Sequence, residues 1–122
     1  MFKLFSIQEA NKLIPVVDGF LGDMQGAVQE TLRLRSELAN LDPISVEARN
    51  KTQELGFLVR VIQDNKLELD RLGVFVQDVN SGSIDFPSQV AGEVVCLSWV
   101  KGEHAITHYH RLNERTRFPL QS

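Results

Sequence analysis

All three histidines of the chain lie close together, at His104, His108 and His110. Imidazoles two residues apart on a β-strand point to the same face, where they can bind one divalent transition metal. A histidine whose pKa is shifted by partial burial can instead act as a general acid or base. The third interpretation is structural, with imidazoles that pack and hydrogen-bond without any ligand. The spacing of the neighbouring carboxylates selects none of them as a further metal ligand, so these alternatives stay open.

The sequence around the histidines predicts a β-hairpin. Residues 93–100 (EVVCLSWV) are rich in β-branched and aromatic residues, Lys101-Gly102 is typical of a turn, and residues 104–110 return the chain. A two-residue turn would place Val95 opposite His108 and the histidines on the same face as Trp99. We expect the helices to cover that apolar face, with the histidines at its edge or beneath it. Cys96 would then lie on the opposite face, as a small buried side chain and not a nucleophile.

A small basic group follows the histidines. Arg111, Arg115 and Arg117 stand within a few residues of one another, whereas the other basic residues are scattered. Such a group is usually solvated, but guanidinium groups that converge can hold a phosphate or a carboxylate. The chain contains no Walker loop, G-x-G-x-x-G, C-x-x-C, H-E-x-x-H or G-x-S-x-G motif, so the sequence assigns no reaction.

Two long helices must position these residues. The stretch S-I-Q-E at 6–9 has the pattern of a capping box, and apolar residues then recur every three or four positions up to Leu41, as in a coiled coil. Thr31 is the one polar residue in this stripe. Asp42-Pro43 breaks the helix, and a second amphipathic helix is predicted from Ser45 to Leu72, ended by Gly73. A short loop between two such helices predicts an antiparallel hairpin.

The remainder of the chain, residues 73–122, is predicted to be β-rich. Residues 74–79 form a predicted strand, 84–87 an irregular or edge segment because of Pro87, and 111–122 a polar tail over the surface. Residues 2–5 could add to the sheet. The predicted fold is therefore α+β: a long antiparallel helical hairpin packed on a small antiparallel β-sheet of three to four strands. We predict a single domain, 1–122, divided into the hairpin at 6–72 and a β-meander with a C-terminal tail at 73–122.

The amino-acid composition limits the classes of partner and the compartments that we expect for this protein. With 13 Lys and Arg against 16 Asp and Glu, the net charge is −3, so we expect no nucleic-acid partner. The chain has no apolar run long enough for a membrane span and no signal-peptide pattern at its start, and its single cysteine suits a reducing compartment, so we expect a cytoplasmic protein.

Phe57 and Val61 lie beside the main apolar stripe of the second helix, which predicts homo-oligomerisation through the helical faces. Three glycines of the first helix, Gly19, Gly22 and Gly26, predict either close approach of a neighbouring backbone or a ligand-facing segment.

Several motifs together resemble a known family. FSIQEANKLIPVV at 5–17, GVFVQDVNSGSIDFP at 73–87, GEVVCLSWVKGEHAITHYH at 92–110 and the R-F-P-L ending are similar to an uncharacterised bacterial family, domain of unknown function 2203. Ser98 stands where the family pattern has a cysteine, and Tyr109 where it has a tryptophan. The resemblance implies no established activity, but it marks matching positions: Asp85, Trp99, Gly102, Glu103, His108, His110 and Arg117.

We predict from the sequence a homo-oligomeric binding or interaction module with a β-hairpin surface that contains histidine and tryptophan. The candidate binding residues are Asp85, Trp99, Glu103 and Arg117. The alternative is a metal-binding protein or small enzyme that uses His108 and His110 as ligands for a divalent transition metal or as acid–base groups.

Overall fold

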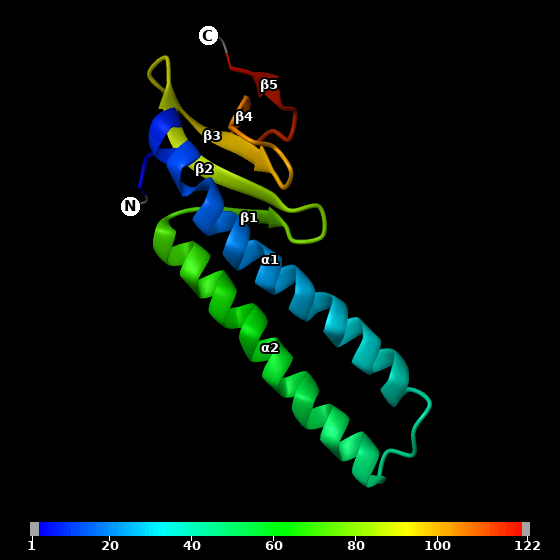
Figure 1. The fold of residues 1–122 in the computed structure, drawn as a ribbon. Helices are drawn as coiled ribbons and strands as arrows, with labels where there is room; N and C mark the ends of the chain where they lie inside the picture. Colours follow the sequence, from blue (N-terminus) through cyan, green and yellow to red (C-terminus); the bar gives the residue numbers. More distant parts are fainter. Residues whose placement is uncertain (1–2, 121–122) are drawn as a thin grey trace.

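The computed structural model describes residues 3–120, in which two long helices form a hairpin packed on a five-stranded antiparallel sheet (Figure 1). The elements are α1 (Ile7–Leu38), α2 (Val46–Leu72), β1 (Phe75–Asp78), β2 (Ser83–Val90), β3 (Glu93–Val100), β4 (His108–Arg111) and β5 (Phe118–Pro119). The strands lie in the sheet in chain order, β1-β2-β3-β4-β5. The predicted α+β class is confirmed, with one or two strands more than expected. Residues 1–2 and 121–122 of the predicted ranges lie outside the described residues.

The helices begin and end where local chemistry predicts. At the start of α1 the Ser6 hydroxyl accepts from the Glu9 N–H at 3.0 Å, and the Glu9 carboxylate accepts from the Ser6 N–H at 2.9 Å. The Ser45 hydroxyl accepts from the Ala48 N–H at 3.1 Å at the start of α2. Gly73 ends α2 with a φ of 89°, a conformation that favours glycine. The capping box and both bounds of the second helix are therefore confirmed.

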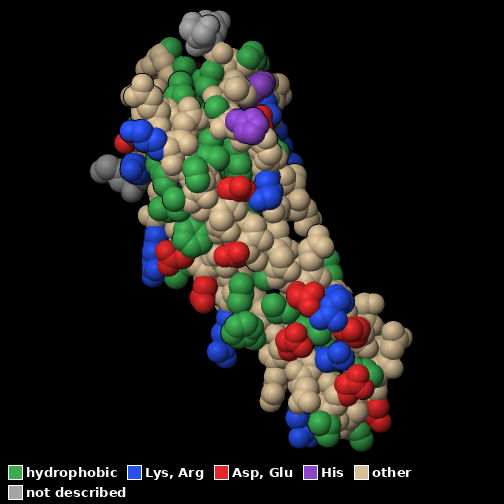
Figure 2. Space-filling view, in the orientation of Figure 1, with side chains coloured by type: hydrophobic (Ala, Val, Ile, Leu, Met, Phe, Trp, Pro, Cys, Tyr) green, Lys and Arg blue, Asp and Glu red, His purple; other side chains and the backbone are tan. Residues whose placement is uncertain are grey.

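The two helices differ in how far they are buried. The buried side chains of α1 extend from Ala10 to Leu34, whereas in α2 only Ala48 and Leu69 are buried. The far half of the hairpin projects beyond the sheet, so no third layer covers it (Figure 1). Apolar side chains therefore reach the surface there among charged ones (Figure 2).

The prediction that a neighbouring backbone closely approaches the α1 glycines is wrong at all three positions. A Cβ atom at Gly19 or Gly26 would meet nothing within 4 Å, and at Gly22 it would meet only the amino group of Lys101 at 3.7 Å. No backbone of another described element lies within 4 Å of these Cβ positions, although Gly22 and Gly26 line a groove between the helices.

The hydrophobic core lies between α1 and one face of the sheet. Its members alternate along β2 and β3, as expected for strands with one covered face. Phe5, just before α1, packs edge-on against Phe86 with ring centroids 5.5 Å apart. The buried sheet side chains of this core are Ile84, Phe86, Leu97 and Trp99.

The segment that contains Pro87 is a central strand, so the prediction of an irregular or edge segment at 84–87 is wrong. β2 pairs with β3 along its whole length, but its pairing with β1 ends at Asp85. The Pro87 carbonyl accepts from the Phe5 N–H at 2.7 Å. The N–H that proline lacks would point to that same side, beyond the end of β1, so no ladder hydrogen bond is lost. Phe5 thus approaches the sheet, but no strand is formed by residues 3–5.

The register between β3 and β4 corrects the predicted orientation of the histidines. β4 begins only at His108, and the connection is the seven-residue loop 101–107 in place of the predicted two-residue turn. Ser98 pairs with His108 and Cys96 with His110. An odd loop reverses the face assignment, so the histidines of β4 share a face with Cys96, not with Trp99.

Specific contacts hold this wider loop. The Glu103 carboxylate accepts from the Val100 N–H at 2.7 Å, and the Asn11 side chain accepts from the Ile106 N–H at 2.8 Å. Ile106 is buried in the core. Because one apolar side chain and one distant amide fix the loop, its length could not be read from turn composition.

The C-terminal segment also differs from the expected surface tail. Residues 118–119 form β5 against β4, and the Leu120 N–H donates to the Thr107 carbonyl at 2.8 Å. Within residues 3–120, neither helix combines the length and apolar character that a membrane span requires.

Candidate ligand-binding site on the open face of the sheet

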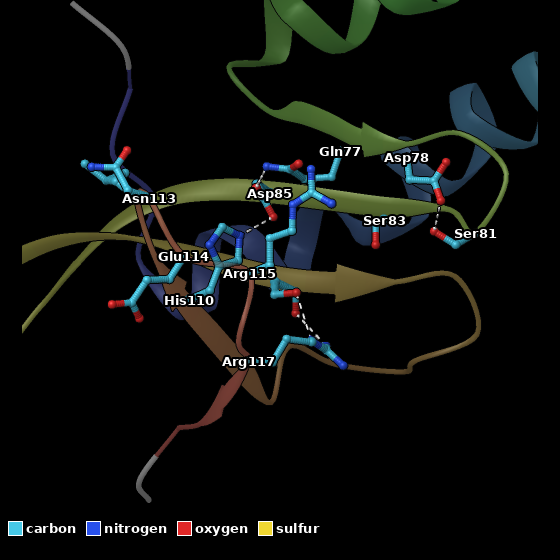
Figure 3. A pocket seen from close by; sticks show the side chains of 12 residues that line it. Gln77, Asp78, Ser81, Ser83, Asp85, His110, Asn113, Glu114, Arg115 and Arg117 are labelled. Carbon is cyan, nitrogen blue, oxygen red and sulfur yellow. Dashed lines mark hydrogen bonds and ion pairs between the residues drawn. The ribbon is translucent and has the colours of Figure 1, made fainter.

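The face of the sheet that points away from the helices carries a polar pocket of about 550 Å³ (Figure 3). Strands β1 to β4 provide its floor, and the segment between β4 and β5 closes one side. The lining residues are Gln77, Asp78, Ser81, Ser83, Asp85, Ser98, His110, Leu112, Asn113, Glu114, Arg115 and Arg117. The volume lies within the range of about 300–1,000 Å³ that is usual for small-molecule sites.

A buried ion pair lies in the floor of this pocket. His110 Nε2 lies 2.9 Å from Asp85 Oδ1, and Asp85 and His110 are only 2% and 6% exposed. The Gln77 amide donates to the other oxygen of Asp85. His110 Nδ1 lies 2.9 Å from the Arg111 carbonyl. Both ring nitrogens thus face oxygen acceptors, an arrangement that an imidazolium, with two donors, satisfies completely.

The electrostatics of the pair favour this charged form. Burial acts to lower the pKa of His110, but the hydrogen bonds to the Arg111 carbonyl and to Asp85, with the charge of Asp85, outweigh it and raise the pKa above its ordinary value. A buried acid–base pair in a polar pocket is a common feature of functional sites.

Cys96 lies beneath the same site. Its sulfur, an oxygen of Asp85 and a ring nitrogen of His110 all lie within 4.8 Å of one another, and all three residues are buried. Burial and the nearby charge of Asp85 raise the pKa of the thiol to about 11, so it is protonated at neutral pH. The prediction that Cys96 and the histidines lie on opposite faces is therefore wrong, although Cys96 is a small buried side chain as expected.

A second polar group joins β3 to the C-terminal segment. Arg117 donates from Nε to the Ser98 hydroxyl at 2.9 Å, and it forms an ion pair with Glu103 at 2.9 Å. The indole N–H of Trp99 donates to the Glu103 carbonyl at 2.9 Å. Of the predicted binding residues, Asp85 and Arg117 thus line the pocket, and Glu103 supports Arg117. Trp99 is 1% exposed in the core and presents no surface to a ligand.

The other two histidines lie outside this pocket. His108 is half-buried, and its Nδ1 lies 2.8 Å from the Thr107 hydroxyl. His104 is exposed in the loop after β3. The structure therefore groups His110 with Asp85 and Cys96, and His108 is not part of that group of candidate metal ligands.

The three arginines of the basic group separate. Arg111 turns away, toward Glu93 at 3.4 Å and over the ring of Phe118. Arg115 and Arg117 both line the pocket (Figure 3). Within residues 3–120, Arg115 forms no hydrogen bond or ion pair.

Sequence reasoning missed Gln77, Ser98 and Cys96 as members of this site. Gln77 and Asp85 meet through the β1–β2 register, which pairs Phe75 with Asp85 and contains an irregularity before Asp78. The alternating polar positions of β2, at Ser83 and Asp85, were the signal in the sequence for a polar face.

Comparison with known proteins assigns the chain to a family but indicates no function. No curated protein and no solved structure matches the chain. One family model, described as an uncharacterised conserved protein, matches residues 3–117. Because the match covers nearly the whole chain, the protein belongs to the family of uncharacterised conserved proteins DUF2203.

Proposed function

We propose that the protein is a binding module for a small anionic ligand, which the pocket on the open face of the sheet holds through Arg115. The observation that carries this proposal is that the guanidinium of Arg115 has no hydrogen-bond or ion-pair partner among the described residues. Arg115 is the one charged residue of the lining without a polar partner within residues 3–120.

The other charges of the lining are already engaged. Asp85 pairs with His110, Arg117 pairs with Glu103, and Glu114 lies 4.0 Å from Arg111. Asp78 accepts from the Ser81 hydroxyl at 2.8 Å and from the Asn80 N–H at 3.2 Å. The uncommitted charge of the lining is therefore a guanidinium, the group best suited to hold a carboxylate or phosphate with two parallel hydrogen bonds.

Neutral donors are available beside it. The side chains of Ser83 and Asn113 line the pocket and form no side-chain hydrogen bond among the described residues. The Ser98 hydroxyl accepts from Arg117, so its own proton is free to be donated. These groups could orient the uncharged part of a ligand whose anionic oxygens contact Arg115.

The test is a titration of metal-free protein, prepared with a chelator, with inorganic phosphate and separately with malonate. Binding is followed by calorimetry and by amide chemical shifts of the pocket residues. We expect saturable binding of at least one probe, weakened about 10- to 150-fold in Arg115→Ala, because a hydrogen bond to a charged group contributes about 1.5–3 kcal/mol. Arg111→Ala is the matched control, since Arg111 faces Glu93 and not the pocket.

The two probes distinguish a phosphate ligand from a carboxylate ligand. The proposal is wrong if neither anion shifts the pocket amides, or if Arg111→Ala weakens binding as much as Arg115→Ala does.

We also propose self-association through the face of the helical hairpin that holds Phe57 and Val61, in a compartment such as the cytoplasm that keeps Cys96 reduced. Phe57 is 64% exposed, and Val61 lines a groove of about 390 Å³ between the helices together with Gly22 and Gly26. A second copy of the hairpin could approach these glycines closely and cover Phe57, in the manner of a coiled coil.

Sedimentation equilibrium tests this second proposal. We expect a dimer or larger species that dissociates in Phe57→Ser/Val61→Ser but not in the control Ile44→Ser, which removes an apolar side chain that is 85% exposed in the loop between the helices. A monomer at all concentrations of the unmodified protein would exclude it.

A further inference from the structure

We propose that Asp85, Cys96 and His110 form a binding site for one divalent transition metal of the Zn²⁺ type. This inference is independent of the anion-binding proposal, because it rests on the buried floor of the pocket and not on Arg115.

The three ligand atoms converge from three adjacent strands. Cys96 of β3 pairs directly with His110 of β4, and Asp85 of β2 pairs with Ser98, two residues from Cys96 on the same face. Directly opposed and diagonal side chains on one face of an antiparallel sheet are near neighbours. The oxygen, sulfur and nitrogen accordingly lie within 4.8 Å of one another.

Further hydrogen bonds orient two of these ligands as in known metal sites. His110 Nδ1 is held by the Arg111 carbonyl, so Nε2 points toward Asp85 and Cys96. One oxygen of Asp85 accepts from the Gln77 amide, which leaves the other for a metal. Metal-binding histidines usually donate their second ring N–H to such a carbonyl, and ligating carboxylates are usually hydrogen-bonded in turn.

The donor set indicates the class of metal. One thiolate, one imidazole and one carboxylate match Zn²⁺, Co²⁺ or a related ion, whereas Mg²⁺ and Ca²⁺ require oxygen ligands. Asp85 and His110 line the pocket and Cys96 lies below it. A fourth ligand could therefore come from the pocket side, as in sites with three protein ligands and one exchangeable position.

Metal binding requires only a small rearrangement of the nitrogen and oxygen ligands, whereas the Cys96 sulfur, now within 4.8 Å of them, would close to the roughly 3.6 Å of a tetrahedral site. In a tetrahedral site with bonds of about 2.0–2.1 Å, the nitrogen and oxygen ligands lie about 3.3 Å apart. The present separation of His110 Nε2 and Asp85 Oδ1 is 2.9 Å. A metal would replace the proton between these atoms and the proton of the Cys96 thiol, and the two anionic ligands would then balance its charge.

The test is a titration of chelator-treated, reduced protein with Co²⁺ in a buffer without phosphate. We expect one Co²⁺ per chain, thiolate-to-cobalt charge-transfer absorption in the near-ultraviolet, and intense visible bands typical of tetrahedral coordination. Zn²⁺ should displace the cobalt and abolish the absorption.

Variants assign the ligands. Cys96→Ser should abolish the charge-transfer band, and Asp85→Asn and His110→Gln should weaken binding at least tenfold. Gln77→Leu should weaken it roughly 10- to 100-fold through loss of the hydrogen bond that orients Asp85. His108→Ala is the matched control, since His108 lies on the same face of β4 but outside the ligand group.

The site is excluded if Co²⁺ binds the unmodified protein without a thiolate band, or does not bind at all, a result that needs no variant to fold. Loss of binding in His108→Ala with retention in Cys96→Ser would transfer the site to the other histidine. Arg115→Ala should keep Co²⁺ binding, so failure of the anion proposal and failure of the metal proposal can be told apart.

Discussion

Replacing Asp85 by asparagine should destabilise the metal-free protein in a pH-dependent manner. The substitution keeps the size of the side chain, removes its charge and replaces one of its two acceptor oxygens by an NH2 donor. His110, which faces Asp85 at 2.9 Å and is 6% exposed, would lose its counter-charge and would still face the Arg111 carbonyl. The free energy of unfolding should therefore fall most at a pH at which His110 is charged.

The magnitude follows from burial and from the direction of the pKa shift. Removal of one partner of a buried ion pair costs about 3–5 kcal/mol. We expect about 3 kcal/mol, the lower end, at about pH 5.5, because His110 can release its proton when the charge of Asp85 is gone. Above the ordinary histidine pKa the lost hydrogen bond dominates, at about 1–3 kcal/mol.

The sign of the pH dependence can be worked out for the unmodified protein. The pKa of folded His110 is raised by its partners, so the pairing contributes its full stability below the unfolded pKa of about 6.5. That contribution is lost as the pH rises through the folded pKa. The free energy of unfolding attributable to His110 should therefore decrease above about pH 6.5. This decrease should be smaller in Asp85→Asn, which keeps the hydrogen bond to the Arg111 carbonyl, and absent in His110→Gln.

Urea unfolding followed by circular dichroism, at about pH 5.5 and about pH 8.5, measures these differences on either side of the ordinary pKa. The double variant Asp85→Asn/His110→Gln completes a cycle whose coupling free energy should exceed about 0.5 kcal/mol at the lower pH. Asp78→Asn, an exposed carboxylate in the same pocket, is the control and should change stability little. The same loss of stability at both pH values, or a coupling free energy of zero, would show that the two groups do not act as an ion pair.

Two further predictions concern residues outside the pocket. The Thr31 hydroxyl is buried and has no hydrogen-bond partner within residues 3–120, so Thr31→Val should raise the free energy of unfolding by about 1 kcal/mol in urea. Gly82 has a φ of +76°, and a Cβ there would lie 2.7 Å from the Cβ of Lys101. Gly82→Ala should therefore lower the free energy of unfolding by about 2 kcal/mol or more. Gly92→Ala should cost only about 1 kcal/mol in the same assay, because its φ is +80° but nothing lies within 4 Å of the new Cβ. Equal costs for the two glycine variants would contradict the steric argument.

Local signals predicted the helices well because their causes lie within a few residues. The Ser6 capping box, the Ser45 cap and the left-handed Gly73 each act over one turn of chain, and the helices begin or end beside them. The first helix ends at Leu38, a few residues before the Asp42-Pro43 break and before the predicted end of its stripe at Leu41. Thr31 is buried within the apolar stripe, as its spacing predicts. In these segments sequence and packing agree because the same periodicity sets both.

The sheet was predicted less well because its register depends on distant partners. Pro87 is compatible with a central strand only because β1 ends its pairing at Asp85. The loop after β3 is fixed by Asn11, which is far away in the sequence, and by the burial of Ile106. Neither the extent of a neighbouring strand nor a long-range hydrogen bond is visible in local composition.

The length of this loop has a chemical consequence. Side chains alternate along a strand, so a connection one residue shorter or longer would turn His110 to the apolar face, beside Leu97 and under the helices. A charged imidazole there would have no carboxylate partner and no access to the pocket. The observed loop places a ring nitrogen of His110 within 4.8 Å of Asp85 and Cys96, on the face that the helices leave uncovered. The anchors of the loop thus determine whether the histidine can take part in binding, although none of them lines the pocket.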